Sequence, residues 1–171
     1  YSAVGVDEIL QRTGISRCSF YYYFKTKEGF GAELIDRYRL SITQKLERCL
    51  SDTSLSPLGS LRAFVGEVRD EMARTDCRSG CLAGKLAQEV NTLPENFREQ
   101  LSAVFAEWQD VFARGLKRAQ ETGEISPELD CASTAAFFWY GWEGALQRAN
   151  LELNIKPVDI FIGNFFSRLT G

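Results

Sequence analysis

The sequence contains no histidine, and its five cysteines include no CxxC pair. Without histidine, the ordinary Ser-His-Asp and Cys-His catalytic arrangements cannot form, and a zinc site that uses histidine is excluded. An odd number of cysteines also argues against a disulfide scaffold. We therefore expect no enzyme activity, no metal site and no cofactor. The cysteines are Cys18, Cys49, Cys77, Cys81 and Cys131.

Long apolar runs are absent as well. No stretch approaches the length of uninterrupted apolar residues that a membrane span requires, and the chain does not open with a secretory pattern. These absences predict a cytoplasmic protein with no membrane partner.

The stretch Gly14–Lys27, GISRCSFYYYFKTK, is the most informative part of the chain. The residues before it, Val6–Thr13, place apolar side chains at helical spacing. Ser16 suits the cap of a second helix, and Gly14 suits the turn before it. The pattern therefore predicts a helix-turn-helix unit, whose second helix is built to enter the major groove of DNA.

Hydroxyl and cationic side chains surround this second helix, and they suit phosphate oxygens beside the groove. Phe20 and Phe24 lie four residues apart on one face and are expected in the core. The predicted DNA-binding residues are Ser16, Arg17, Ser19, Tyr21, Tyr22, Lys25, Thr26 and Lys27.

The run ISRCSFYYYFKTKEGF resembles the DNA-binding signature of TetR-family transcriptional regulators, over a region from Val6 to Phe30. Cys18 departs from the pattern, because many relatives have glycine there. The resemblance implies a homodimer that binds a palindromic double-stranded DNA operator, with a second domain that binds a small-molecule effector. Related folds place one more helix first, so we expect the head to lack its first helix.

The charge distribution agrees with this organisation. Residues 1–40 hold six Lys or Arg and five Asp or Glu, a net charge of +1, whereas the whole chain has −3 and the remainder therefore −4. A mildly basic head on an acidic body fits a modest phosphate footprint. We place the DNA-binding domain at residues 1–27 and the effector-binding and dimerisation domain at residues 28–171.

The body follows a helical pattern throughout, with no strand-like alternation. The fold class is therefore all-α, a truncated helix-turn-helix head on a helical ligand-binding and dimerisation domain. Helices are expected at about residues 26–50, 57–74, 81–91, 94–122 and 130–152, and from Pro157 onward.

The segment Ala135–Trp142 is apolar on every side, so it needs cover on both sides. A second subunit would provide it, and Gly141 and Gly144 would permit close helix approach. The alternative is that this is the central core helix of a monomer. The predicted dimer interface consists of Phe138, Trp142, Ala145, Phe161 and Phe165.

The effector site is expected among the middle helices, with Cys81 in the first turn of a helix that Ser79 caps. The helix dipole and Lys85 would favour a reactive thiolate there. GCLAGKLAQE also resembles a segment of TetR-family branches that respond to electrophiles, hypochlorite or acrylate-like compounds, although a buried packing cysteine is the alternative. The predicted effector-binding residues are Cys81, Phe64, Val68, Phe105, Trp108, Phe112 and Trp139.

These patterns together predict a DNA-binding transcriptional regulator, a repressor released from its operator by a small apolar or electrophilic effector. The alternative is a helical small-molecule-binding or thiol-dependent protein without operator binding.

Overall fold

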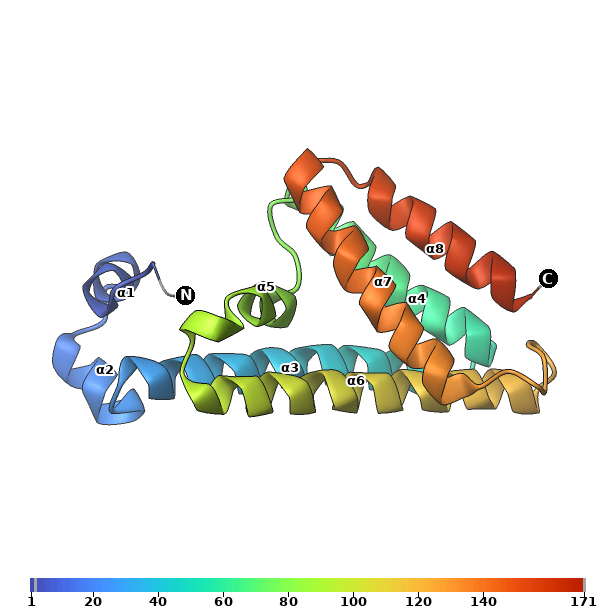
Figure 1. The fold of residues 1–171 in the computed structure, drawn as a ribbon, viewed down its shortest axis with the longest axis horizontal. Helices are drawn as coiled ribbons and strands as arrows, with labels where there is room; N and C mark the ends of the chain where they lie inside the picture. Colours follow the sequence, from blue (N-terminus) through green and yellow to red (C-terminus); the bar gives the residue numbers. More distant parts are fainter. Residues whose placement is uncertain (2, 171) are drawn as a thin grey trace. The chain divides into compact units, whose positions relative to one another are not determined.

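The computed structural model describes residue 1 and residues 3–170, and these residues form helices and loops without a strand among them (Figure 1). The predicted all-α class is confirmed. No helix in the described ranges is both long and apolar enough to span a membrane. The helices are α1 (Val6–Thr13), α2 (Arg17–Phe24), α3 (Lys27–Ser51), α4 (Pro57–Arg74), α5 (Leu82–Gln88), η1 (Val90–Thr92), α6 (Glu95–Glu121), α7 (Cys131–Glu152) and α8 (Lys156–Leu169).

The chain divides into two compact units. The first combines residues 1–41 with residues 82–104, and the second combines residues 42–81 with the residues from Phe105 onward. The long helices α3 and α6 contribute to both units. Compactness therefore groups the start of α3, α5 and the start of α6 with the predicted head, and the functional boundary at Lys27 stays a prediction.

The turn between α1 and α2 forms as the sequence predicts. Gly14 adopts a left-handed conformation with φ 69°, which glycine adopts without steric cost, and its N–H donates to the Leu10 carbonyl at 2.9 Å. The Ser16 hydroxyl accepts from the Ser19 N–H at 3.1 Å and so caps α2.

A small aromatic cluster supports α2 from below. Phe20 is buried, and its ring centroid lies 5.1 Å from that of Phe24 and 5.4 Å from that of Phe30. Because Phe20 and Phe24 face this cluster, the intervening tyrosines of α2 face solvent.

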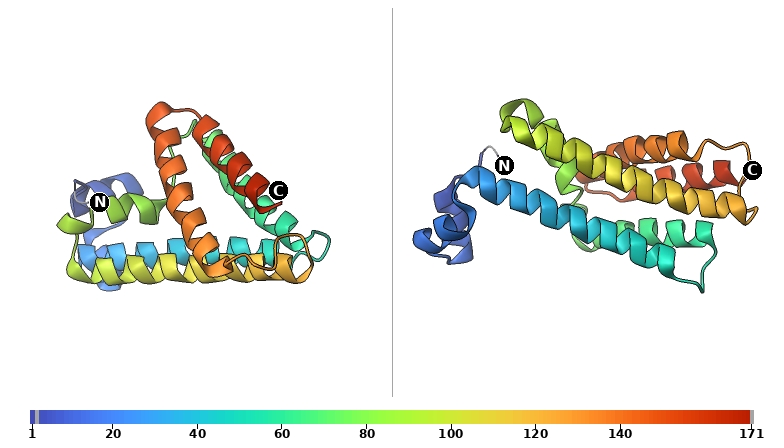
Figure 2. Two further views of the ribbon diagram at one scale, coloured as in Figure 1. Left: turned by 45° about the vertical axis from the view of Figure 1, so that its right-hand side comes forward. Right: turned by 90° about the horizontal axis from the view of Figure 1, so that it is seen from below.

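Helices α3 and α6 run parallel, as hydrogen bonds within each unit show (Figure 2). In the first unit, the Gln100 amide donates to the Ala32 carbonyl at 2.9 Å. In the second unit, the Thr43 hydroxyl donates to the Glu107 carboxylate at 2.6 Å.

In the second unit, α8 folds back along α7, and both helices bury aromatic side chains between them (Figure 1). Phe138 of α7 stacks on Phe112 of α6 at a centroid distance of 4.0 Å and contacts Phe165 of α8 at 5.0 Å. A Cβ atom at Gly141 would overlap the Phe161 ring, so this glycine permits the close approach of α7 and α8 within one chain. Nothing lies within 4 Å of a Cβ at Gly144.

Candidate functional site

The solvent face of α2 carries the polar side chains that the sequence singled out. Ser16, Arg17 and Ser19 are exposed, and 38% of Tyr21 and 71% of Tyr22 are accessible. Tyr23, which the prediction omitted, is 75% exposed and packs its ring edge against Tyr22 at 5.1 Å. Its position in the FYYYF run was the available signal, because Phe20 and Phe24 leave all three tyrosines on the outer face.

Some of the predicted DNA-binding cations already have partners in the first unit. The Arg17 guanidinium forms an ion pair with Asp7 of α1. The Lys27 ammonium donates to the Tyr1 carbonyl at 3.0 Å and lies 4.6 Å from the centre of the Tyr1 ring. Lys27 is therefore half-buried, and the expectation that it is an exposed phosphate contact is corrected.

Lys25 ends α2 in an unusual backbone conformation, with φ 63°. Its ammonium donates to the Tyr22 carbonyl at 2.7 Å and lies 5.2 Å from the centre of the Tyr22 ring. The carbonyl at the end of α2 is thereby satisfied. Lys25 and Thr26 are both exposed beside the tyrosines.

The predicted effector-binding residues belong to two neighbouring aromatic groups of the second unit. Trp139 stacks on Trp108 at 5.2 Å and lies 6.4 Å from Phe64, and all three side chains are buried. Phe105 is half-buried and meets Trp108 at 5.6 Å. The other group centres on Phe138.

Phe112 belongs to that other group, because it stacks on Phe138. It therefore does not contact the Trp139 ring through any stacked aromatic pair of its own. Val68 of α4 is half-buried. The cluster around Trp139 is the better candidate for an effector site, since it contains the polar atoms described next.

Glu143, one turn after Trp139 on α7, is the functional candidate that the sequence prediction missed. Burial raises the pKa of its carboxyl to about 7, and a hydrogen bond from the Cys81 thiol acts in the opposite direction. A signal was present, because Glu143 is the one charged residue between Cys131 and Gln147. A buried charge in an apolar helix costs free energy and is seldom retained without a use.

Two polar atoms of this face of α7 have no hydrogen-bond partner among the described residues. They are the Trp139 indole Nε1 and the Glu143 Oε1, and both are buried. Residues four apart on a helix lie on the same face, so both atoms border one region. Buried polar groups are nearly always paired, and an unpaired donor and acceptor side by side indicate a site for a polar ligand group.

Cys81 is buried and stands immediately before the first residue of α5, not within its first turn as predicted. Ser79 does not reach that helix end as a cap, because its hydroxyl is paired with the Thr75 hydroxyl at 2.6 Å. The thiol contacts the Glu143 carboxyl instead. An ionised carboxylate disfavours a neighbouring thiolate, so the Cys81–Glu143 pair controls where the proton resides.

The predicted dimer-interface residues need correction. Phe138, Trp142, Ala145 and Phe165 are buried inside the single chain, and Phe161 is half-buried against Gly141. Their apolar surface is already used by the packing of α6, α7 and α8. The exposed apolar side chains of α7 and α8 are different ones, namely Phe137, Tyr140, Leu151 and Ile160.

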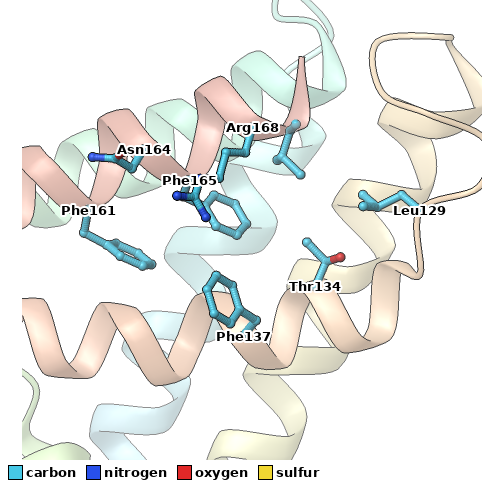
Figure 3. Close-up of a pocket in the computed structure, with 8 residues that line it drawn as sticks. Leu129, Thr134, Phe137, Phe161, Asn164, Phe165 and Arg168 are labelled. Atoms are coloured by element: carbon cyan, nitrogen blue, oxygen red, sulfur yellow. The ribbon is translucent and has the colours of Figure 1, made fainter. Parts of the chain in front are cut away.

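A hollow of about 310 Å³ lies between α7 and α8 on this outer face (Figure 3). Phe137 rises from α7 toward Phe161 and Phe165 of α8, and Arg168 lies beside them. Phe137 is 59% exposed, although the hollow around it is mostly apolar. This face therefore presents apolar surface that a second molecule can cover.

A helix-turn-helix unit with an exposed second helix, joined to a helical body with a buried polar site, defines a class of protein. It is the class of DNA-binding regulators that sense a signal in one part and bind an operator with another.

Comparison with known proteins identifies the family within this class. Residues 1–34 match the family described as bacterial regulatory proteins, tetR family, and residues 57–165 match the family described as tetracyclin repressor-like, C-terminal domain. The chain belongs to the TetR family. It is accordingly a transcriptional regulator and not an enzyme.

Individual relatives agree with this assignment. The chain is 43% identical to the transcriptional regulator AcuR of Cereibacter sphaeroides, over 96% of this chain and 75% of AcuR. It is 28% identical to the repressor DhaR of Mycobacterium sp. (strain GP1), over 99% of this chain and 83% of DhaR. The crystal structure of a TetR regulatory protein from Rhodobacter sphaeroides superposes with a TM-score of 0.93 at 43% identity, covering 96% of this chain and 87% of the other.

Proposed function

We propose that the chain is a cytoplasmic repressor that binds a palindromic operator as a homodimer and leaves it when a small apolar or electrophilic effector acts on the helical body. The observation that carries the operator-binding part is the outer face of α2, where exposed hydroxyl and cationic groups follow a capped turn. Relatives such as DhaR are named as repressors, which supports the direction of control.

The proposed DNA contacts are Arg17, Ser19, Tyr21, Tyr22 and Lys25, with Ser16 and Thr26 beside them. Tyrosine and serine hydroxyls donate to phosphate oxygens, and Arg17 reaches either a phosphate or a base edge once its ion pair with Asp7 opens. Lys27 supports the head from within through Tyr1.

The proposed dimer contact is the outer face of α7 and α8 around the hollow at Phe137. Exposed apolar side chains gather there, and a helical pair presented by each protomer makes a self-complementary two-fold surface. Two recognition helices held in this way would address half-sites about 34–36 Å apart, or a multiple of that spacing.

The proposed effector site is the region around Cys81, Trp139 and Glu143, with Phe64 and Trp108 as its apolar lining. An effector releases the operator only if it favours one arrangement of the two heads over the other. Modification of the buried Cys81 adds bulk next to Glu143 and so changes the packing of α7. Cys18, exposed on α2, offers a competing route in which a modified thiol blocks DNA directly.

The test begins with DNA selected by the full chain from a random double-stranded library. Selected sequences should be palindromic, and the purified protein should shift them on a gel at low salt. Failure to bind any sequence more tightly than unrelated DNA would contradict the regulator function. The same assay in the presence of N-ethylmaleimide then compares Cys81→Ser with Cys18→Ser. Loss of release in Cys81→Ser alone supports the body as sensor, and loss in Cys18→Ser alone places it on α2.

A further inference from the structure

We propose that Cys81, Trp139 and Glu143 form a reaction site for small uncharged α,β-unsaturated carbonyl compounds, in which Glu143 accepts the thiol proton and Trp139 donates a hydrogen bond to the carbonyl oxygen. This inference rests on the proposed function, because it takes Cys81 as the sensing thiol. It goes further by assigning roles to two residues and by naming the chemical class of the effector.

The three groups meet in the second unit. The Cys81 thiol donates a hydrogen bond to the Glu143 carboxyl, so sulfur and carboxyl are in contact. Trp139 lies one turn before Glu143 on the same face of α7. A ligand that reaches the Cys81 sulfur therefore also borders the Glu143 carboxyl and the Trp139 indole edge.

The unpaired atoms indicate which groups the ligand must carry. The Trp139 side chain is 2% exposed, and its Nε1–H has no acceptor within the described part of the chain. A buried donor without an acceptor is unfavourable, and a carbonyl oxygen from a ligand would satisfy it. The protein thus offers a fixed donor at the position where a carbonyl oxygen gains negative charge during addition.

The surroundings favour an uncharged compound. Trp139 stacks on Trp108 and lies close to Phe64, and both neighbours are buried. Transfer of an ionised ligand into such aromatic surroundings costs more free energy than transfer of a neutral enone or enal. The site has no room for a long polar group among these rings, so we expect a small molecule.

Glu143 suits the role of base. A carboxyl with a pKa of about 7 is partly ionised at neutral pH, and a base is most effective when its pKa lies near the working pH. It contacts the thiol whose proton must leave. An ordinary exposed carboxyl, with a pKa near ~4.3, would be a much weaker proton acceptor.

The reaction balances without an oxidant or other co-reactant. The S–H bond of Cys81 breaks, and its proton passes to the Glu143 carboxylate. The sulfur lone pair forms a C–S bond to the β carbon, and the C=C π electrons move to give an enolate, whose oxygen accepts from Trp139 Nε1–H. The proton then passes from Glu143 to the α carbon. The product is a thioether, and Glu143 is ionised again.

The experiment uses the full-length chain and two thiol reagents of similar size, methyl vinyl ketone and iodoacetamide. The first adds through an enolate, whereas the second loses iodide and builds little charge on its carbonyl oxygen. Mass spectrometry follows the rate of adduct formation at Cys81 and at the exposed Cys18, which serves as an internal reference. The readout is the ratio of the methyl vinyl ketone rate to the iodoacetamide rate at each cysteine.

We expect this ratio to be about tenfold higher at Cys81 than at Cys18, because only Cys81 has a donor for the enolate. Trp139→Phe should lower the Cys81 ratio to that of Cys18, whereas Trp142→Phe, a buried tryptophan on the same helix, should not. Glu143→Gln should slow both reagents at Cys81 by about tenfold at pH 7.5. Glu152→Gln, an exposed acid on the same helix, is the matched control.

Equal ratios at Cys81 and Cys18 in the unmodified protein would overturn the role of Trp139, and this comparison needs no variant to fold. A faster Cys81 in Glu143→Gln would show that the carboxylate suppresses the thiol and would overturn its role as base. Operator release is measured separately by gel shift. Release by methyl vinyl ketone with equal ratios would leave the proposed function standing and reject this inference alone.

Discussion

The thiol of Cys81 donates a hydrogen bond to the carboxyl group of Glu143, which burial keeps partly protonated at neutral pH. Cys81 precedes α5, whereas Glu143 lies in the middle of α7. The contact therefore links two segments that are far apart in the sequence, and it couples the reactivity of the thiol to the titration of a buried acid.

The stability of the protein should depend on the titration of Glu143. Its folded pKa of about 7 lies above the ordinary value of 4.5, so the folded state binds this proton more tightly than the unfolded state does. The contribution is fully present below pH 4.5 and is lost as pH rises through 7. The difference of about 2.5 pKa units corresponds to roughly 3 kcal/mol.

Urea unfolding at pH 5 and pH 8 measures this effect. Glu143→Gln should flatten the loss of stability between the two pH values, and Glu152→Gln on the same helix should leave it unchanged. An equally steep pH dependence in Glu143→Gln would assign the proton to another group.

Replacement of Arg17 should weaken operator binding. Arg17→Ala removes one cation from the outer face of α2, so binding to all DNA sequences should weaken and the salt dependence should flatten by about one unit if Arg17 contacts a phosphate. Arg12→Ala is the matched control, because Arg12 is an exposed cation of α1 paired with Glu8. Gel shifts at several salt concentrations give both slopes.

Lys27→Ala should leave the salt slope unchanged. The Lys27 ammonium is already engaged by the Tyr1 carbonyl and ring, so it is not available to neutralise a phosphate. We expect a lower melting temperature instead, because Lys27 and Tyr1 are joined by a second hydrogen bond from the Tyr1 hydroxyl to the Lys27 carbonyl at 2.9 Å. A slope reduced to the same extent as in Arg17→Ala would restore Lys27 to the DNA-binding face.

A charge at Phe137 should produce folded monomers. Phe137→Glu places a carboxylate in the apolar hollow of the proposed interface without disturbing the core, because Phe137 is exposed in the single chain. Trp142→Arg should unfold the protein instead, because Trp142 is buried within one chain. Sedimentation reports the mass and circular dichroism the fold, with the exposed Leu55→Glu as control. A dimeric Phe137→Glu protein would place the interface elsewhere.

Two glycines of α7 should respond to alanine with opposite signs. Gly141→Ala places a methyl group against the Phe161 ring and should destabilise the fold by about 1–3 kcal/mol. Gly144→Ala meets no atom within 4 Å, so it should stabilise the helix by about 0.5–1 kcal/mol. Chemical denaturation of both variants gives the two values, and a destabilised Gly144→Ala protein would show that a partner helix approaches there.

Much of the local structure follows from short-range chemistry, and the sequence is sufficient to predict it. Gly14 at the turn, Ser16 at the cap of α2, Pro57 at the start of α4 and Asp130 at the cap of α7 all occupy the expected positions. Each depends on a few neighbouring residues, since caps and left-handed turns are decided within one helical turn. The all-α class and the helix-turn-helix follow from the same local signals.

Only the tertiary structure decided which apolar and charged side chains are used inside one chain. The periodicity of α7 could not separate the buried Phe138 and Trp142 from the exposed Phe137 and Tyr140, because all four are aromatic. Glu143 became a candidate only when burial raised its pKa and brought Cys81 against it. Burial and long-range contact depend on how α4, α6, α7 and α8 pack, and a residue's neighbours along the chain carry little information about that packing.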